Sequence, residues 1–396
     1  MEDNSWRKSI TLFLASQSLS LFGSSVVSFA IIWYITLETS SGIWVTAFTI
    51  CSLVPQVVIS LWAGVWADRY DRRNLIRLSD GLMALVTLGL AMVFWAGYQR
   101  LELLLAVSFF RSVCAGIQMP AVMAAFPQIV PMGKLTRVQG INQTITSVLM
   151  LLSPAVGGVV LGSLGIVWAL LLDVITAFWA VVILSFITLA RVDRSGATTS
   201  VITDLRQGIK YAFSDQLLKR LLIFYGIAFF LVTPAAFLTP LLVERIFGSD
   251  VWKLTANEMA WTLGSLVGGI FVSLRGEFKN KIFTISVSLI CFGVSFAMLG
   301  LSTNFLLYLI IMGVAGIFMP VMATAETVLI QEKVETEMMG RVFSLLQIVT
   351  GSAMPFAILF FGPLADIVAI GSILFVSGAL LAFTGIIFQI TTKQYV

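Results

Sequence analysis

The sequence predicts an all-α membrane protein whose twelve transmembrane helices form two pseudo-symmetric six-helix bundles, with both termini in the cytoplasm. Three observations predict this fold class: an apolar composition, a regular series of long apolar segments, and a repeat that relates the two halves. Of the 396 residues, 59% are hydrophobic and 11% are charged, and the mean hydropathy is +1.00. Soluble domains carry about 25% charged residues, so the composition indicates a chain that resides in a lipid bilayer.

Twelve segments are long and apolar enough to cross the bilayer, because a helix of roughly 20 residues spans the hydrocarbon core. The first of them is longer than the apolar part of a cleavable signal peptide, so we expect it to stay as a transmembrane helix. The predicted spans are 10–37, 43–67, 74–97, 101–125, 138–162, 166–190, 220–242, 256–274, 282–302, 305–329, 340–364 and 367–390.

The distribution of basic residues predicts the orientation of these spans. Of the 24 Lys and Arg residues, 20 lie in the two termini and in the connections after the even-numbered spans. Cytoplasmic connections are enriched in Lys and Arg, so both termini are predicted to be cytoplasmic. The net charge of +4 then reflects membrane topology, and we expect no nucleic-acid partner.

An internal repeat divides the chain into two halves. The segment AGIQMPAVMA at 115–124 returns as AGIFMPVMAT at 315–324, at the same place in the fourth and tenth spans. We therefore predict an N-terminal six-helix bundle at 1–190 and a C-terminal six-helix bundle at 220–396. The polar stretch 191–219 between them is predicted to be a cytoplasmic linker that contains an amphipathic helix. Two parallel six-helix halves are typical of secondary transporters.

The residue types exclude several function classes. The chain has no His, which excludes His-based metal sites, His-dependent hydrolases and His-based proton relays. It has no G-x-x-x-x-G-K-[ST] loop, so ATP is not the direct energy source. Cys51, Cys114 and Cys291 all lie inside apolar segments, where unpaired Cys behaves as a small hydrophobic residue. We expect no enzyme activity, no cofactor and no metal.

The segment GVWADRYDRRN at 64–74 places five charges in six positions between two apolar spans. It contains Gly64, Asp68, Arg69, Arg72 and Arg73 with the spacing G-x-x-x-D-R-x-x-R-R, on the predicted cytoplasmic turn between spans two and three. In this motif the chain resembles the major facilitator superfamily. The segments QEKVETEMMGRVFSL at 331–345 and PLAD at 363–366 resemble its macrolide-efflux branch of drug:proton antiporters, and SPAVGG at 153–158 is similar to the core of the antiporter motif.

The resemblance implies a secondary transporter of the bacterial cytoplasmic membrane that exports hydrophobic or amphipathic drugs, macrolide-like or multidrug, in exchange for protons. Its partners would be a small hydrophobic or amphipathic substrate, protons and the lipid bilayer, and we expect a monomer. Three alternatives remain open on the same fold: a lipid exporter, a siderophore exporter and an uptake symporter. A membrane receptor without transport activity is the less favoured alternative.

Charged residues inside the spans are the candidates for proton coupling, because an uncompensated charge in the membrane costs at least ~2.5–3.5 kcal/mol. Arg111 lies near the middle of span four, and the resemblance implies an arginine linked to proton movement there. Asp173 in span six is its best-matched partner by depth. Both residues could instead form a structural ion pair. Asp80 lies one helical turn after Arg77, and we expect local pairing or support of a gate.

Polar and aromatic residues along the spans are candidates for substrate binding. Small polar residues can line a wetted cavity or mediate close helix packing, and aromatic residues in membrane helices serve mostly in packing or lipid contact. The expected substrate-binding residues are Gln17, Ser24, Gln118, Asn142, Phe224, Tyr225, Phe229 and Gln347.

The charged turn is predicted to act as a cytoplasmic gate. Asp68 ends span two where span eleven begins, and the start of a helix favours a carboxylate by ~0.3–1 kcal/mol. Arg69, Arg72 and Arg73 would hold Asp68 and pair with nearby acidic residues, although these arginines could also serve topology alone. Glu326 is expected to form a salt bridge in the same gate. The gating residues on this interpretation are Gly64, Asp68, Arg69, Asp71, Arg72, Arg73, Asp80, Glu326, Gly340 and Arg341.

Overall fold

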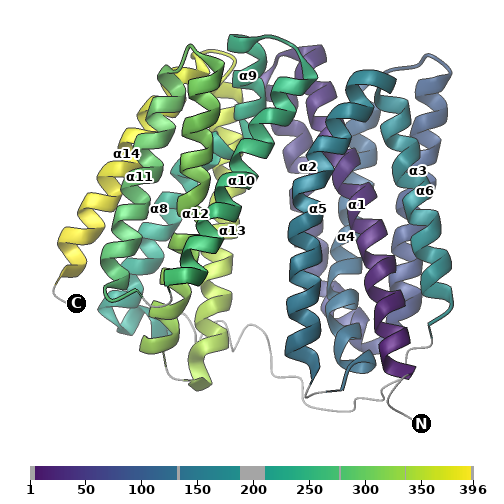
Figure 1. The fold of residues 1–396 in the computed structure, drawn as a ribbon, viewed down its shortest axis with the longest axis horizontal. Coiled ribbons are helices and arrows are strands. Elements are labelled where there is room, and N and C mark those ends of the chain that lie inside the picture. Colours follow the sequence, from purple (N-terminus) through teal and green to yellow (C-terminus); the bar gives the residue numbers. More distant parts are fainter. Residues whose placement is uncertain (1–4, 132–133, 188–209, 276–277, 335, 394–396) are drawn as a thin grey trace. The chain divides into compact units, whose positions relative to one another are not determined.

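A computed structural model describes residues 5–131, 134–187, 210–275, 278–334 and 336–393, and these residues form helices and short connections without any strand (Figure 1). The helices are α1 (Ser5–Thr39), α2 (Gly42–Arg69), α3 (Arg72–Trp95), α4 (Leu101–Ile129), α5 (Leu135–Leu164), α6 (Ile166–Ser185), α8 (Gln216–Phe237), α9 (Thr239–Phe247), α10 (Val251–Arg275), α11 (Lys281–Leu301), α12 (Phe305–Lys333), α13 (Thr336–Leu364) and α14 (Ile370–Thr392). Most of the predicted linker lies outside the described residues.

Eleven helices of the described residues are long and apolar enough to cross a membrane, which confirms the multi-span fold class. The predicted eighth span, 256–274, lies within α10, and α10 is absent from these eleven. Asn257 and Glu258 in its first half lower its hydropathy. Many large apolar side chains of the outer helix faces are exposed, such as Phe178 (59%) and Trp179 (52%), as expected for surfaces that face lipid rather than water.

The predicted seventh span, 220–242, is wrong as one continuous helix. The structure breaks it at Leu238, between α8 and the nine-residue helix α9. Pro240 lies in the first turn of α9, where its missing N–H costs no hydrogen bond, whereas inside a continuous helix it would remove one. Gly248, with φ +105°, ends α9 in a conformation that favours glycine.

The first compact unit contains α1, α3, α4, α5, α6 and the larger part of α2, together with residues 250–255 at the start of α10. Within it, α1 packs against α5 and α6, while α3 packs against α4 and α6. At one end Phe13 of α1 contacts Phe126 of α4 edge to face, with ring centroids 5.3 Å apart. This packing fixes the helix faces that form the cavity described below.

The second compact unit contains α8, α9, most of α10, and α11 to α14, together with residues 40–46 at the start of α2. Within it, α11 packs against α12 and α14, and α8 packs against α13 and α14. Gly293 of α11 and Gly378 of α14 lie so close to the facing helix backbone that a Cβ at either would overlap main-chain atoms. This small-residue contact allows the two helices to approach closely.

Short polar side chains start several of these helices. Asp71 accepts hydrogen bonds from the Arg73 and Asn74 amides at the start of α3, and Asp215 does the same for the Leu217 and Leu218 amides of α8. Asn280 and Asn304 cap α11 and α12. Asp and Asn are favoured at these positions because their side chains satisfy amides that have no partner within the helix.

Candidate functional site

A cavity of about 370 Å³ lies among α1, α2, α3, α4 and α5 of the first unit. Four predicted substrate-binding residues line it: Gln17, Ser24, Gln118 and Asn142. Hydroxyl and amide groups of α1, α2, α4 and α5 line it together with Met side chains of α3 and α4. Among the described residues that line it, Arg111 is the only charged one. The cavity can therefore hold an amphipathic molecule that presents oxygen or nitrogen atoms toward α1 and α4.

Arg111 and Asp173 form a buried ion pair at this cavity, which confirms the pairing that the sequence predicts. The Arg111 guanidinium donates to Asp173 Oδ2, and the two side chains are only 9% and 2% exposed. Arg111 also donates to Thr87 Oγ1 at 2.6 Å, and the Ser24 hydroxyl donates to Asp173 Oδ1 at 3.3 Å. Removing one partner of such a pair costs about 3–5 kcal/mol because the other charge stays buried.

Close helix contacts bring these side chains together. A Cβ at Gly23 would overlap Thr176 Oγ1, so α1 approaches α6 closely enough for the neighbouring Ser24 to reach Asp173. On the other side of the cavity, the Ser112 hydroxyl donates to Ser52 O at 2.6 Å and accepts from Gln56 N at 2.9 Å. The Ser112 hydroxyl therefore bridges two backbone groups of α2 that would otherwise bond directly to each other, one turn apart and next to Pro55.

Asp80 does not line the cavity but contacts two residues that do, Ser20 and Gln118. The expected pairing of Asp80 with Arg77 is wrong. Asp80 is completely buried, and its Oδ1 accepts hydrogen bonds from Ser20 Oγ at 2.6 Å and Gln118 Nε2 at 2.8 Å. The i, i+3 spacing would allow Asp80 to pair with Arg77, but the Asp80 side chain is directed toward Ser20 of α1 and Gln118 of α4. Sequence spacing along one helix does not show which face meets a neighbour.

The described residues of the charged turn contact other helices of the first unit. Asp71 caps α3, the Arg72 guanidinium donates to Ala124 O at 2.7 Å, and the Arg73 guanidinium donates to Ser185 O. Arg72 and Arg73 thus each bind a carbonyl oxygen, near the ends of α4 and α6 respectively. The side chains of the other gating residues on the turn and on α13 lie outside the described residues; these are Gly64, Asp68, Arg69, Gly340 and Arg341.

The remaining predicted residues lie in the second unit. Glu326 is 9% exposed, its Oε1 has no hydrogen-bond partner, and it forms no ion pair with a described residue, so the expected salt bridge is absent there. Tyr225 beside it is 1% exposed, and its ring stacks on Phe229 at 6.2 Å. Phe224 packs against Phe388 of α14. Gln347 is exposed on α13.

Sequence reasoning missed a second polar cluster, in the second unit. The Tyr308 hydroxyl donates to Asn257 Oδ1 at 2.8 Å, and the Asn257 amide donates to Glu258 Oε1 at 3.4 Å. The charge of Glu258 inside a predicted span was the signal that could have revealed it. Among the described residues, no group of three or more Cys, Asp and Glu side chains could hold a metal ion.

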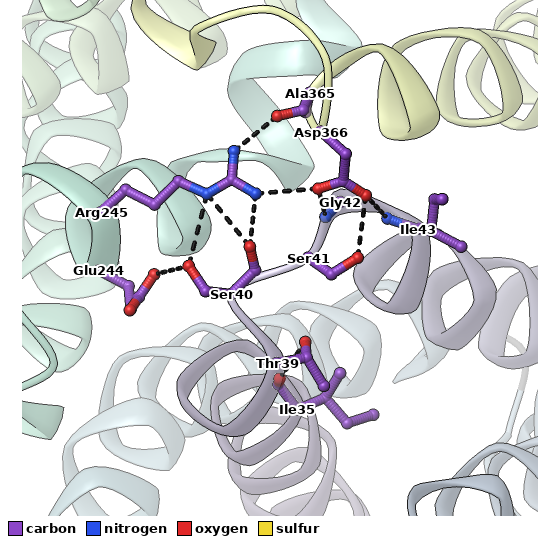
Figure 2. A network of polar contacts seen from close by, with 10 residues as sticks. All are labelled: Ile35, Thr39, Ser40, Ser41, Gly42, Ile43, Glu244, Arg245, Ala365 and Asp366. Carbon is purple, nitrogen blue, oxygen red and sulfur yellow. Dashed lines mark hydrogen bonds and ion pairs between the residues drawn. The ribbon is translucent and has the colours of Figure 1, made fainter.

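A clamp on the first turn of α2 was also missed (Figure 2). Asp366, just after α13, accepts hydrogen bonds from Gly42 N at 2.6 Å and Ile43 N at 3.0 Å, and from the Ser41 hydroxyl at 2.9 Å. Arg245 of α9 donates to Asp366 Oδ1 at 2.9 Å. A carboxylate that binds free amides at a helix start is favoured by the helix dipole.

Arg245 also connects this clamp to Ser40, which belongs to the same unit. Its guanidinium donates to Ser40 O and, at 2.5 Å, to Ala365 O, while the Ser40 hydroxyl donates to Glu244 Oε2 at 2.6 Å (Figure 2). Ser40 has φ +47°, which is unusual for a residue with a Cβ. α2 starts here within the second unit and continues from Ala47 in the first unit. The clamp therefore fixes the first turn of α2 within the second unit.

The family model of the Major Facilitator Superfamily matches residues 13–358. Macrolide efflux protein A of Streptococcus pyogenes is 26% identical over 390 residues, which cover 97% of this chain and 96% of that protein. Multidrug efflux pump Tap of Mycolicibacterium fortuitum is 21% identical over 380 residues, covering 92% and 90% of the two chains. A bacterial homologue of the iron transporter ferroportin has the same fold, with a TM-score of 0.73, 16% identity, and coverage of 96% and 98%.

The apolar helices and the family match are those of a multi-pass transporter of the cell membrane. The chain belongs to the major facilitator superfamily, with efflux proteins for macrolides and for multiple drugs among its similar relatives.

Proposed function

We propose that this transporter exports hydrophobic or amphipathic drugs, including macrolides, in exchange for protons by alternating access. The observation that carries the proposal is the buried Arg111–Asp173 ion pair beside a cavity of amphipathic character. The full-length similarity to macrolide and multidrug efflux proteins supports the substrate class.

The ion pair contains a carboxylate, Asp173, that can bind either a proton or the positive charge of Arg111. Asp173 accepts from Arg111 and Ser24, and both of these residues also line the cavity. A proton that binds Asp173 removes the negative charge and releases the Arg111 guanidinium. Loss of that proton restores the pair. A ligand that places a hydrogen-bond donor or a positive charge near Ser24 is favoured only while Asp173 is ionised. Such a ligand competes with the proton, and this reciprocal exclusion is the thermodynamic requirement for exchange.

The proposal is tested first in cells. Expression in a drug-sensitive bacterium should raise the inhibitory concentration of a macrolide and of amphipathic dyes, and an Arg111→Ala variant at equal abundance should not. Efflux of the macrolide should collapse when a protonophore removes the proton gradient. Unchanged sensitivity to all these compounds would contradict drug export and would favour a lipid or siderophore as substrate. Increased accumulation of the macrolide would favour uptake.

A further inference from the structure

Asp80 is a buried carboxyl group for which the exchange mechanism above has no use. Its side chain is 0% exposed, and the two donors to its Oδ1 come from two different helices, Ser20 on α1 and Gln118 on α4. Its Oδ2 is buried without any hydrogen-bond partner among the described residues. A buried carboxylate with an unsatisfied oxygen is costly, so this oxygen is a place where a proton can bind.

Gln118 stands between Asp80 and the cavity. Ser20 and Gln118 both line the cavity, whereas Asp80 does not. An ionised carboxylate can only accept hydrogen bonds, so it holds the amide nitrogen of Gln118 and leaves the amide oxygen for other partners. That oxygen accepts no hydrogen bond from the described part of the chain. With Asp80 ionised, Gln118 therefore presents an acceptor to a molecule in the cavity.

We propose that Asp80 and Gln118 form a proton-dependent switch that changes which hydrogen-bonding group the cavity wall presents. When a proton binds Asp80 at Oδ2, a rotation of the carboxyl group brings the new O–H opposite Gln118, and this donor favours the amide oxygen of Gln118 as its partner. The amide then rotates, and its N–H₂ group faces the cavity. No covalent bond other than the O–H bond forms or breaks. The binding of one proton to Asp80 thus replaces the hydrogen-bond acceptor that Gln118 presents to the cavity with a hydrogen-bond donor.

The switch assigns a chemical class to the part of the substrate that contacts Gln118, provided that the proposed proton exchange is right. In an exchanger the ligand must favour the state without the proton. Only that state offers an amide oxygen, so the ligand must bring a hydrogen-bond donor to it. Because Arg111 is the only charged residue in the part of the cavity lining that the structure describes, the donor that fits best is a neutral hydroxyl group.

The other ionisable groups around Asp80 do not replace this switch. Arg111 and Cys114 face it from α4, and Asp173 faces it from α6. Arg111 and Asp173 are paired with each other, so their effects on Asp80 oppose one another. α1 contributes the uncharged Ser20. The two hydrogen bonds to Oδ1 are therefore the local interactions that a ligand can change.

The switch is tested without any ligand by infrared spectroscopy on the purified full-length protein in lipid nanodiscs. A pH titration should show a protonated-carboxyl band that is missing in Asp80→Asn. In Gln118→Leu, which removes one donor to the charged form, the band should appear at a pH about one unit higher. Gln56→Leu is the matched control, because Gln56 lines the same cavity but contacts Met119 instead of Asp80. Equal titrations of Gln118→Leu and Gln56→Leu would overturn the switch.

The ligand class is tested with two probes that differ in donors. Erythromycin carries hydroxyl groups, whereas tetraphenylphosphonium has no hydrogen-bond donor. Erythromycin should bind the wild type about tenfold more weakly at low pH than at high pH, and this difference should be smaller in Gln118→Leu, in which only the contribution of Asp173 remains. Tetraphenylphosphonium should show no dependence on Gln118. Erythromycin binding that follows pH equally in the wild type and in Gln118→Leu would overturn the assignment, and the infrared result distinguishes this outcome from a failure of the proposed transport activity.

Discussion

The clamp of Asp366 on the first turn of α2 allows the effect of one substitution to be estimated. Asp366→Asn keeps the size of the side chain but removes its charge and one acceptor oxygen. The Asp366 and Arg245 side chains are 22% and 29% exposed, so their ion pair lies between an exposed pair, worth below ~1 kcal/mol, and a buried one. The substitution also removes the negative charge that favours the start of α2. Together, the two losses should reduce the stability of the clamp by about 2 kcal/mol.

Hydrogen–deuterium exchange of the full-length protein measures this loss directly. A weakening of about 2 kcal/mol should speed exchange in the peptide that covers residues 40–46 about 30-fold. Asp250→Asn is the matched control, since Asp250 pairs with Lys253 at 2.7 Å but is 58% exposed and belongs to another helix start. Exchange that is unchanged in Asp366→Asn, or equally fast in both variants, would refute the role of the clamp.

The clamp should also be insensitive to pH near neutrality. Burial raises the pKa of Asp366, but the hydrogen bonds from two backbone amides, the Ser41 hydroxyl and Arg245 outweigh it, so the pKa lies below its usual range. A lowered pKa means that the stabilisation is fully present above the ordinary value of about 3.9 and is lost only as pH falls through the lowered one. Exchange at residues 40–46, corrected for its intrinsic pH dependence, should therefore be constant from about pH 5 to about pH 8.

Three further substitutions test the other charged groups. Arg111→Ala should leave Asp173 buried without its partner, cost about 3–5 kcal/mol and abolish energised efflux; a thermal unfolding scan and dye efflux at matched abundance would show this, and full efflux would contradict it. Arg111→Ala combined with Asp173→Ala should recover part of the lost stability but none of the transport; two losses that simply add would argue against the pair. Asp68→Asn should shift a cysteine accessibility reporter toward the inward-open state and reduce efflux, and an unmoved reporter would leave this residue without a gating role.

The sequence predicts those features that depend on local composition or on the cost of an isolated charge. Long apolar segments determine the transmembrane helices, because lipid leaves few alternatives for the backbone. The Arg111–Asp173 pair follows from the same reasoning, since a buried charge at that depth needs a partner. The break at Leu238 interrupts an apolar segment, so hydropathy alone does not reveal it, although Pro240 marks it.

The contacts that were missed depend on how helices are rotated and on which segments meet across a long separation in sequence. Asp80 meets Ser20 and Gln118 because one face of α3 is turned inward, and the spacing to Arg77 could not show this. Asp366 meets the start of α2 more than 320 residues earlier in the chain. No local pattern relates those two segments.

Proton exchange through Asp173 is tested most directly by the pH inside vesicles that contain the purified protein. Vesicles loaded with erythromycin and a pH-sensitive dye are diluted into drug-free buffer with no imposed pH gradient. The drug then leaves down its own gradient, and exchange predicts that protons enter and the lumen becomes acidic, whichever way the protein is oriented. Asp173→Asn should lose this acidification. A lumen that becomes alkaline, or acidification of equal size in Asp173→Asn, would contradict the account.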